Sequence, residues 1–261
     1  MDYKERVREQ DLQKIQQLRI FDDEFLKEIF DGNTEATELV LNIVFGRNDL
    51  KVMKVIGQRE IKGIEGHSVR LDIMAQDSEN HAYDIEVQRQ DSGWLPLRAR
   101  YNSSMMDTVL LPSGEDYSKL IPTYVIFFIE TDTVGDKRPL HHYVMRDIET
   151  NDLLGDERHI MFVNGENDDE STRLGKLVHD FKCTSADDMY YDVLAKRVRH
   201  FKETEGGVSY MSKIMDEVRI EATIDTLRDV GISESEIKEK IMAKFKLSEK
   251  EAKNYMEKKI A

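Results

Sequence analysis

The chain has 261 residues and a formal net charge of −14 at pH 7; 39% of its residues are hydrophobic and 34% are charged. Such a composition is typical of a folded globular protein with one large domain, or a core domain and a smaller appendage. The acidic balance argues against a surface that coats nucleic acid broadly, because attraction to phosphate comes from lysine and arginine. It does not exclude a cluster of carboxylates that becomes less negative when a cation binds.

Membrane and secretory classes are also disfavoured. No apolar run approaches the ~18–20 residues that cross a bilayer, and the charged start MDYKERVREQ lacks the apolar stretch of a secretory signal. Cys183 is the single cysteine, so an intrachain disulfide is impossible. We therefore expect a cytoplasmic protein without a membrane partner.

The first half of the chain changes from helical to strand periodicity. Apolar residues recur at helical spacing over residues 21–46, where Asp31-Gly32-Asn33 divides two helical pieces. Three segments then alternate like strands, at residues 50–64, 67–76 and 81–90. Turns are predicted between them, at Gly63–Gly66 and in the QDSEN segment, residues 76–80.

A helix and a buried strand follow. Residues 95–114 predict a helix that ends at Pro112 and Gly114, with Leu97, Tyr101, Met105 and Val109 as its apolar stripe. Residues 121–130, IPTYVIFFIE, form the most apolar run and predict a central strand covered on both faces. The order is therefore α, β, β, β, α, β.

The second half predicts two more strands, at residues 140–147 and 157–165, and helices at 171–181 and 185–203. Three helices end the chain, at 211–231, 233–246 and 248–260. The last two begin with capping boxes, Ser233 to Glu236 and Ser248 to Glu251. A boundary near Gly206-Gly207 predicts two domains, residues 1–205 and a helical C-terminal appendage of residues 206–261.

Acidic residues on two adjacent predicted strands point to a metal site. Asp72 and Glu86 are 14 positions apart, so they approach each other if the strands pair as a hairpin. Gln88 shares the face of Glu86 because side chains alternate along a strand. Mg²⁺ is usually held by one or two carboxylates together with waters and phosphate oxygens. The alternative is that each acid is simply solvated on a half-exposed strand.

The order FDDEFLKEIF, VRLDIMA, YDIEVQRQ, LRARYNSSMMD and YVIFFIE resembles the PD-(D/E)XK nuclease superfamily. More closely, it resembles the recombination-promoting nuclease (Rpn-type) family related to transposases. The resemblance implies an α/β fold with a restriction-endonuclease-like αβββαβ core, in which helices flank a mixed central sheet. This order agrees with the one read from periodicity alone.

The resemblance also implies roles for individual residues. Asp72 matches the superfamily's metal-binding aspartate, and Glu86 matches the acidic residue of its (D/E)XK element. Gln88 stands where the pattern has lysine, and Leu71 replaces the proline that usually precedes the aspartate. Asp23, beside Asp22, is the best match for an acidic group from the first core helix. It is equally consistent with an ordinary N-terminal helix residue favoured by the helix dipole.

Two functions follow as hypotheses. In the first, the protein is a Mg²⁺- or Mn²⁺-dependent DNA endonuclease linked to recombination or mobile elements, with Gln88 positioning water and Arg98 contacting a phosphate. In the second, the neutral Gln88 has cost the protein its activity and left a module that binds DNA or protein. Arg98 then is a plain surface cation. DNA is the expected partner in the first hypothesis, and a homo-oligomer is left open.

Overall fold

The computed structural model describes residues 3–61, 69–90, 93–167 and 169–257. The chain divides into two compact units, one of residues 17–199 and one of residues 1–16 with 200–261. The domain boundary predicted between residues 205 and 206 stays a prediction. The predicted turn at Gly63–Gly66 lies outside the described residues.

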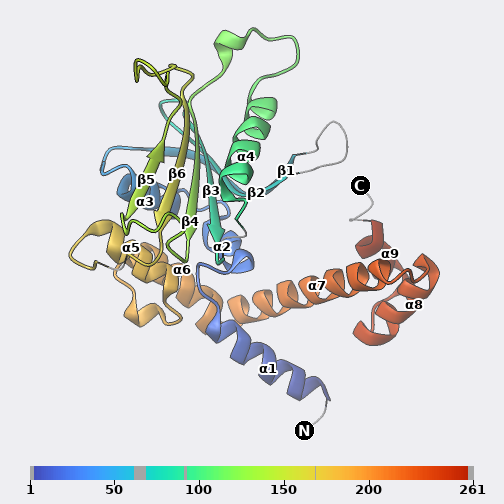
Figure 1. The fold of residues 1–261 in the computed structure, drawn as a ribbon. Coiled ribbons are helices and arrows are strands. Elements are labelled where there is room, and N and C mark those ends of the chain that lie inside the picture. Colours follow the sequence, from blue (N-terminus) through green and yellow to red (C-terminus); the bar gives the residue numbers. More distant parts are fainter. Residues whose placement is uncertain (1–2, 62–68, 91–92, 168, 258–261) are drawn as a thin grey trace. The chain divides into compact units, whose positions relative to one another are not determined.

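A six-stranded sheet organises the described part of the first unit, in the order β1-β2-β3-β4-β6-β5 (Figure 1). Neighbours β1, β2 and β3 are antiparallel, β3, β4 and β6 are parallel, and β5 runs antiparallel to β6. The strands are β1 (Val52–Ile61), β2 (Val69–Asp77), β3 (Ala82–Gln88), β4 (Thr123–Ile129), β5 (Leu140–Tyr143) and β6 (Arg158–Asn164).

Helices cover both faces of this sheet. Phe127 of β4 belongs to a buried apolar cluster with residues of α4, whereas the next residue, Phe128, stacks on Phe181 of α5 with ring centroids 4.6 Å apart. Because consecutive side chains of a strand point to opposite faces, α4 and α5 lie on opposite sides of β4. The helices of this unit are α2 (Asp23–Phe30), α3 (Thr34–Val44), α4 (Leu95–Leu110) and α5 (Arg173–Lys182), with 3₁₀ turns at Tyr117–Lys119 and Ala186–Asp188. Helix α6 (Asp192–Glu203) begins in this unit and ends in the other.

The turn between β2 and β3 holds the register of this hairpin. The carboxylate of Asp77 accepts hydrogen bonds from the backbone N–H groups of Glu79 and His81, at 2.9 and 2.8 Å. The Tyr83 hydroxyl also donates to Asp77, at 2.6 Å. Asn80 adopts a left-handed backbone with φ of 68°, which asparagine tolerates better than most residues. This turn pairs Ile73 with Ile85 and Met74 with Asp84.

The mixed sheet with flanking helices confirms the predicted fold class. One predicted helix, at residues 185–203, is divided in the structure. The buried carboxylate of Asp180 accepts the backbone N–H groups of Tyr190 and Tyr191, each at 2.8 Å. Since these donors are held outside a helix, the 3₁₀ turn and α6 are separate elements.

The apolar stripe predicted for α4 was partly wrong. Leu97 and Tyr101 are 46% and 42% exposed, whereas Leu95, Ala99 and Asn102 are buried. The helix turns this second stripe to the sheet because polar side chains on the same face, Arg98 and Asn102, hydrogen-bond to buried carboxylates.

The second unit is helical in its described residues. It contains α1 (Tyr3–Gln17), α7 (Glu205–Asp229), α8 (Glu234–Phe245) and α9 (Glu249–Glu257). Helix α7 begins six residues before the predicted start at 211 because Thr204 caps it, accepting from the Gly207 N–H at 3.1 Å. A side chain at position 207 would clash with the His200 carbonyl oxygen, so Gly207 allows the two segments to approach closely.

The capping box at Ser248 forms in both directions. The Glu251 N–H donates to Ser248 Oγ at 3.3 Å, and the Ser248 N–H donates to Glu251 Oε2 at 2.8 Å. At Ser233 the hydroxyl accepts from the Glu236 N–H at 3.4 Å. Isoleucines of α7 and α8 form the core of these helices with Ala252 and Met256 of α9. Among the described helices, we find none with the length and apolarity to cross a membrane.

Candidate metal-binding and catalytic site

Asp72 and Glu86 meet where β2 and β3 run side by side. The backbone N–H of Asp72 donates to Glu86 Oε1 at 3.1 Å. Glu86 has an exposed fraction of 0%, and Asp72 is half-buried. The hairpin predicted from the sequence therefore brings these two residues together, and both carboxyl groups are largely removed from water.

Arg98 of α4 is the counterion of Glu86. One guanidinium nitrogen, Nη2, lies 2.5 Å from Glu86 Oε2, and the other, Nη1, donates to Gln88 Oε1 at 2.6 Å. The guanidinium also lies over the Phe127 ring, 5.2 Å from its centroid. Arg98 thus holds the first and last members of the Glu86-Val87-Gln88 tripeptide, which the sequence did not predict.

Asp84 is a third acid of the cluster that sequence reasoning did not select. It is fully buried, and it shares a strand face with Glu86 and Gln88 because they lie two positions apart. Asp84 Oδ2 accepts from Asn102 of α4 at 3.1 Å, whereas Oδ1 is buried without a hydrogen-bond partner among the described residues. A buried carboxylate oxygen without a donor is costly and calls for a proton or a cation, and a proton shared by the side chains of Asp84 and Glu86 meets this need when no cation is bound.

The crowding of these acids changes their ionisation. Desolvation, followed by the nearby charges of Glu86 and Asp23, raises the pKa of Asp72 to about 8. Desolvation also raises the pKa of Asp84 to about 7, partly opposed by its hydrogen bond with Asn102. The pKa of Glu86 lies well above its usual value because of burial and the charge of Asp84, although Arg98 opposes the change. Without a cation, protons are held in this cluster near neutral pH.

An open cleft of about 800 Å³ lies over the ends of β3 and β4. Its lining includes Asp23, Gln88 and Arg98, so three of the predicted site residues face one space. The pKa of Asp23 is raised, first by desolvation and then by Glu24, while Arg98 lowers it. The remaining lining residues are Val87, Arg89, Gln90, Glu130 and Thr131.

The amide of Gln88 is engaged at both ends. Besides accepting from Arg98, it donates through Nε2 to the Gln90 carbonyl at 2.6 Å. A carboxamide has two N–H donors and two acceptor lone pairs. Counting partners among the described residues, one donor and one acceptor site of Gln88 are left for a water molecule in the cleft.

Arg89 of the cleft lining is paired with acids, one of which is shared with Arg19. Arg89 lies 3.4 Å from Asp22 and 3.6 Å from Glu130, and Arg19 lies 2.5 Å from Glu130. Arg89 is 60% exposed, so its pairs are of the weak, solvated kind. A phosphate entering the cleft would compete with these carboxylates for Arg89, which sequence reasoning did not select.

The chemical type of the donors, carboxylate oxygens, suits a hard divalent cation. Carboxylate oxygens are the ligands that Mg²⁺ and Mn²⁺ prefer, and the unpartnered oxygen of Asp84 adds to those of Asp72 and Glu86. In this arrangement Arg98 occupies Glu86 Oε2. Asp72, Asp84 and Glu86 do not bring three ligand atoms within 4.8 Å of one another in this arrangement. Among the described residues two groups do, His179 with Asp180 and Cys183, and Asp77 with Glu79 and His81.

The carboxylates of these two groups already serve the fold. Asp180 caps the N–H groups of Tyr190 and Tyr191, and Asp77 accepts the N–H groups of the β2–β3 turn. Their oxygens are therefore used by hydrogen bonds that a metal ion would displace.

Comparison with known proteins gives one family. A family model described as "PD-(D/E)XK nuclease family transposase" matches residues 27–167. The matched segment extends from α2 to just beyond β6 and includes Asp72, Asp84, Glu86 and Arg98, whereas Asp23 lies before it. No curated protein and no solved structure gave a significant match.

Proposed function

Because the chain belongs to the PD-(D/E)XK nuclease family transposases, we propose that it is a metal-dependent endonuclease that hydrolyses phosphodiester bonds of DNA, in recombination or in the movement of mobile elements. The observation that carries this proposal is the acid cluster of buried Asp84 and Glu86 with half-buried Asp72, next to Gln88 and Arg98, which line the cleft. A buried cluster of like charges destabilises a fold unless it has a partner.

Asp72 and Glu86 are the proposed metal ligands, with Asp84 held behind them by Asn102. When bound, Mg²⁺ or Mn²⁺ would supply a Lewis acid that activates water and offsets charge on the phosphodiester. The raised pKa values of Asp72 and Glu86 support this assignment, because strongly shifted pKa values with identifiable charge partners are typical of functional sites. The metal-free cluster would release protons as it takes up the cation.

Residues of the cleft act on the water and the phosphate. Gln88 offers a remaining donor and acceptor to orient the attacking water. Arg98 carries a fixed positive charge between Glu86 and the cleft, and a phosphate oxygen would compete with Glu86 for its guanidinium. Asp23, which lines the cleft, is the proposed additional acid. DNA is thus the proposed partner, and a cytoplasmic location and self-association stay predictions.

A second function is favoured by one observation, the pairing of Gln88 with Arg98 at 2.6 Å. If this contact persists with DNA bound, no free cation replaces the lysine of the family pattern, and the protein is a silent module that binds DNA or protein. Strand transfer, which needs more than hydrolysis, is not part of either proposal.

Nicking of supercoiled plasmid in the presence of Mg²⁺ or Mn²⁺ tests the first proposal. We expect wild-type protein to nick the plasmid, and Asp72→Asn and Glu86→Gln each to lower the rate by roughly 100-fold. Asp156→Asn and Glu115→Gln, which change exposed acids of the same types, are matched controls and keep the wild-type rate. Nicking that survives both site substitutions rejects the assignment, and binding without nicking favours the silent module.

A further inference from the structure

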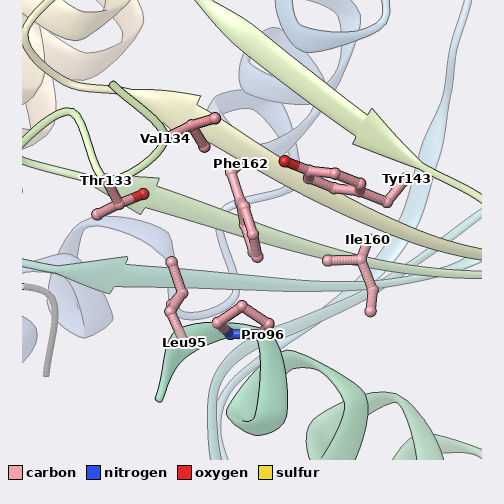
Figure 2. Close-up of a pocket in the computed structure, with 7 residues that line it drawn as sticks. All are labelled: Leu95, Pro96, Thr133, Val134, Tyr143, Ile160 and Phe162. Atoms are coloured by element: carbon pink, nitrogen blue, oxygen red, sulfur yellow. The ribbon is translucent and has the colours of Figure 1, made fainter. Parts of the chain in front are cut away.

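A separate apolar pocket opens beside the catalytic cleft (Figure 2). It has a volume of about 430 Å³. Its walls are the first turn of α4, with Leu95 and Pro96, the segment after β4, with Thr133 and Val134, and side chains of β5 and β6 that include Tyr143 and Phe162. No charged side chain lines it among the described residues.

Two of these walls continue into the catalytic cleft. On α4, Pro96 lines the pocket and Arg98, two residues later, lines the cleft. After β4, Thr131 lines the cleft and Thr133 lines the pocket. Phe127 links the two spaces, because the Arg98 guanidinium lies 5.2 Å from its ring centroid and the Phe162 ring of the pocket lies 6.3 Å from it. The pocket is therefore a neighbour of the cleft.

The lining of the pocket suits a flat, uncharged ring. Phe162 and Tyr143 lie with ring centroids 5.4 Å apart and an interplanar angle of 59°. Tyr143 and Val134 are 44% and 42% exposed, so this aromatic surface is accessible. Figure 2 shows the hydroxyls of Thr133 and Tyr143 directed toward the space among the lining side chains. These hydroxyls can donate to or accept from the edge of a heterocycle.

We propose, on the basis of the proposed nuclease function, that this pocket receives one unpaired base of the DNA substrate next to the phosphate in the cleft. Bases stack on aromatic side chains with little regard to sequence, and enzymes that bind an extruded base do so between apolar and aromatic groups. A volume of about 430 Å³ is at the lower end for small-ligand sites and suits one base. The substrate class is thus DNA with an unpaired base near the cleaved bond.

The test compares binding of two duplexes that differ by a single unpaired adenine. Fluorescence anisotropy with Asp72→Asn protein keeps the DNA intact. We expect the bulged duplex to bind roughly tenfold more tightly than the paired duplex. Adding Val134→Trp, which fills the pocket from an exposed position, should bring the ratio of affinities to about one. Val230→Trp, at an exposed valine of the other unit, is the matched control and keeps the preference.

The outcomes separate this inference from the function on which it rests. Equal affinity for both duplexes, or a preference that survives Val134→Trp, overturns the base pocket. A change of oligomeric state in Val134→Trp, seen by sedimentation without a change of preference, also overturns it and identifies a contact between copies. If wild-type protein shows the preference but nicks no DNA, the nuclease proposal fails while the pocket stands.

Discussion

The backbone N–H of Asp72 donates a 3.1 Å hydrogen bond to Glu86 Oε1. This bond ties the side chain of one proposed metal ligand to the strand that carries the other. It leaves Glu86 Oε2 to Arg98, 2.5 Å away. Glu86 is thereby held between a strand and a helix.

Removing the counterion of Glu86 should destabilise the fold. In Arg98→Ala the buried carboxylate loses its charged partner, and we expect the free energy of unfolding in urea to fall by about 1–3 kcal/mol at neutral pH. Because the cost arises from an unpaired acid, the double variant Glu86→Gln/Arg98→Ala should recover most of it. If the decreases in the free energy of unfolding of the two single variants simply add in the double variant, the two side chains are not coupled.

Stability should fall as pH rises. The pKa of Asp72 is raised from 3.8 to about 8 in the folded protein, so between these values the folded state binds more protons than the unfolded state. The free energy of unfolding contributed by Asp72 therefore decreases from about pH 4 to pH 8. His142 and His159, whose pKa values are lowered, act in the opposite direction as their unfolded forms lose protons.

The difference between wild type and Asp72→Asn isolates this contribution. Thermal melting in the presence of a chelator should show the wild type losing stability relative to Asp72→Asn as pH rises. When Mn²⁺ replaces the chelator, the lost stability should return in the wild type alone. A constant difference across this pH range would contradict the raised pKa of Asp72.

Asp84→Asn should separate stability from metal binding. The substitution removes a buried acid whose Oδ1 has no partner among the described residues, so the metal-free protein should melt at a higher temperature above pH 7. The same change weakens the negative field at the cation, and we expect Mn²⁺ affinity to fall roughly 10–100-fold. Unchanged affinity in a calorimetric titration would remove Asp84 from the site.

Arg98 and Gln88 should exchange roles. Arg98 already places a cation beside Gln88. Gln88→Lys therefore brings two cations together at this contact, and Arg98→Gln removes the cation from it. We expect each single variant to nick plasmid more slowly in single-turnover assays, and Gln88→Lys/Arg98→Gln to recover part of the lost rate. A double variant slower than both singles would show that Gln88 acts independently of the nearby charge.

Strand periodicity was sufficient to predict the αβββαβ core and the meeting of Asp72 with Glu86. The same alternation puts Asp84 on the strand face of Glu86. It does not predict that Asp84 is buried, because that burial results from α4 covering the strand. Arg98 and Glu86 lie on a helix and a strand that are joined by a loop. No spacing rule predicts the angle between these two elements, so the contact could not be predicted from the sequence. The predicted apolar stripe of α4 was wrong for Leu97 and Tyr101. The helix instead turns Arg98 and Asn102 toward the sheet, where they form hydrogen bonds with buried acids.

The most direct test of the central claim, that Asp72 and Glu86 share one divalent cation, is calorimetric titration of Mn²⁺ into the full chain. We predict saturable binding by the wild type, affinity at least roughly tenfold weaker in Asp72→Asn and Glu86→Gln, and wild-type affinity in His179→Ala and Glu79→Gln, which alter the other two ligand groups. Wild-type affinity in both site variants, or binding lost only in His179→Ala or Glu79→Gln, would contradict the claim.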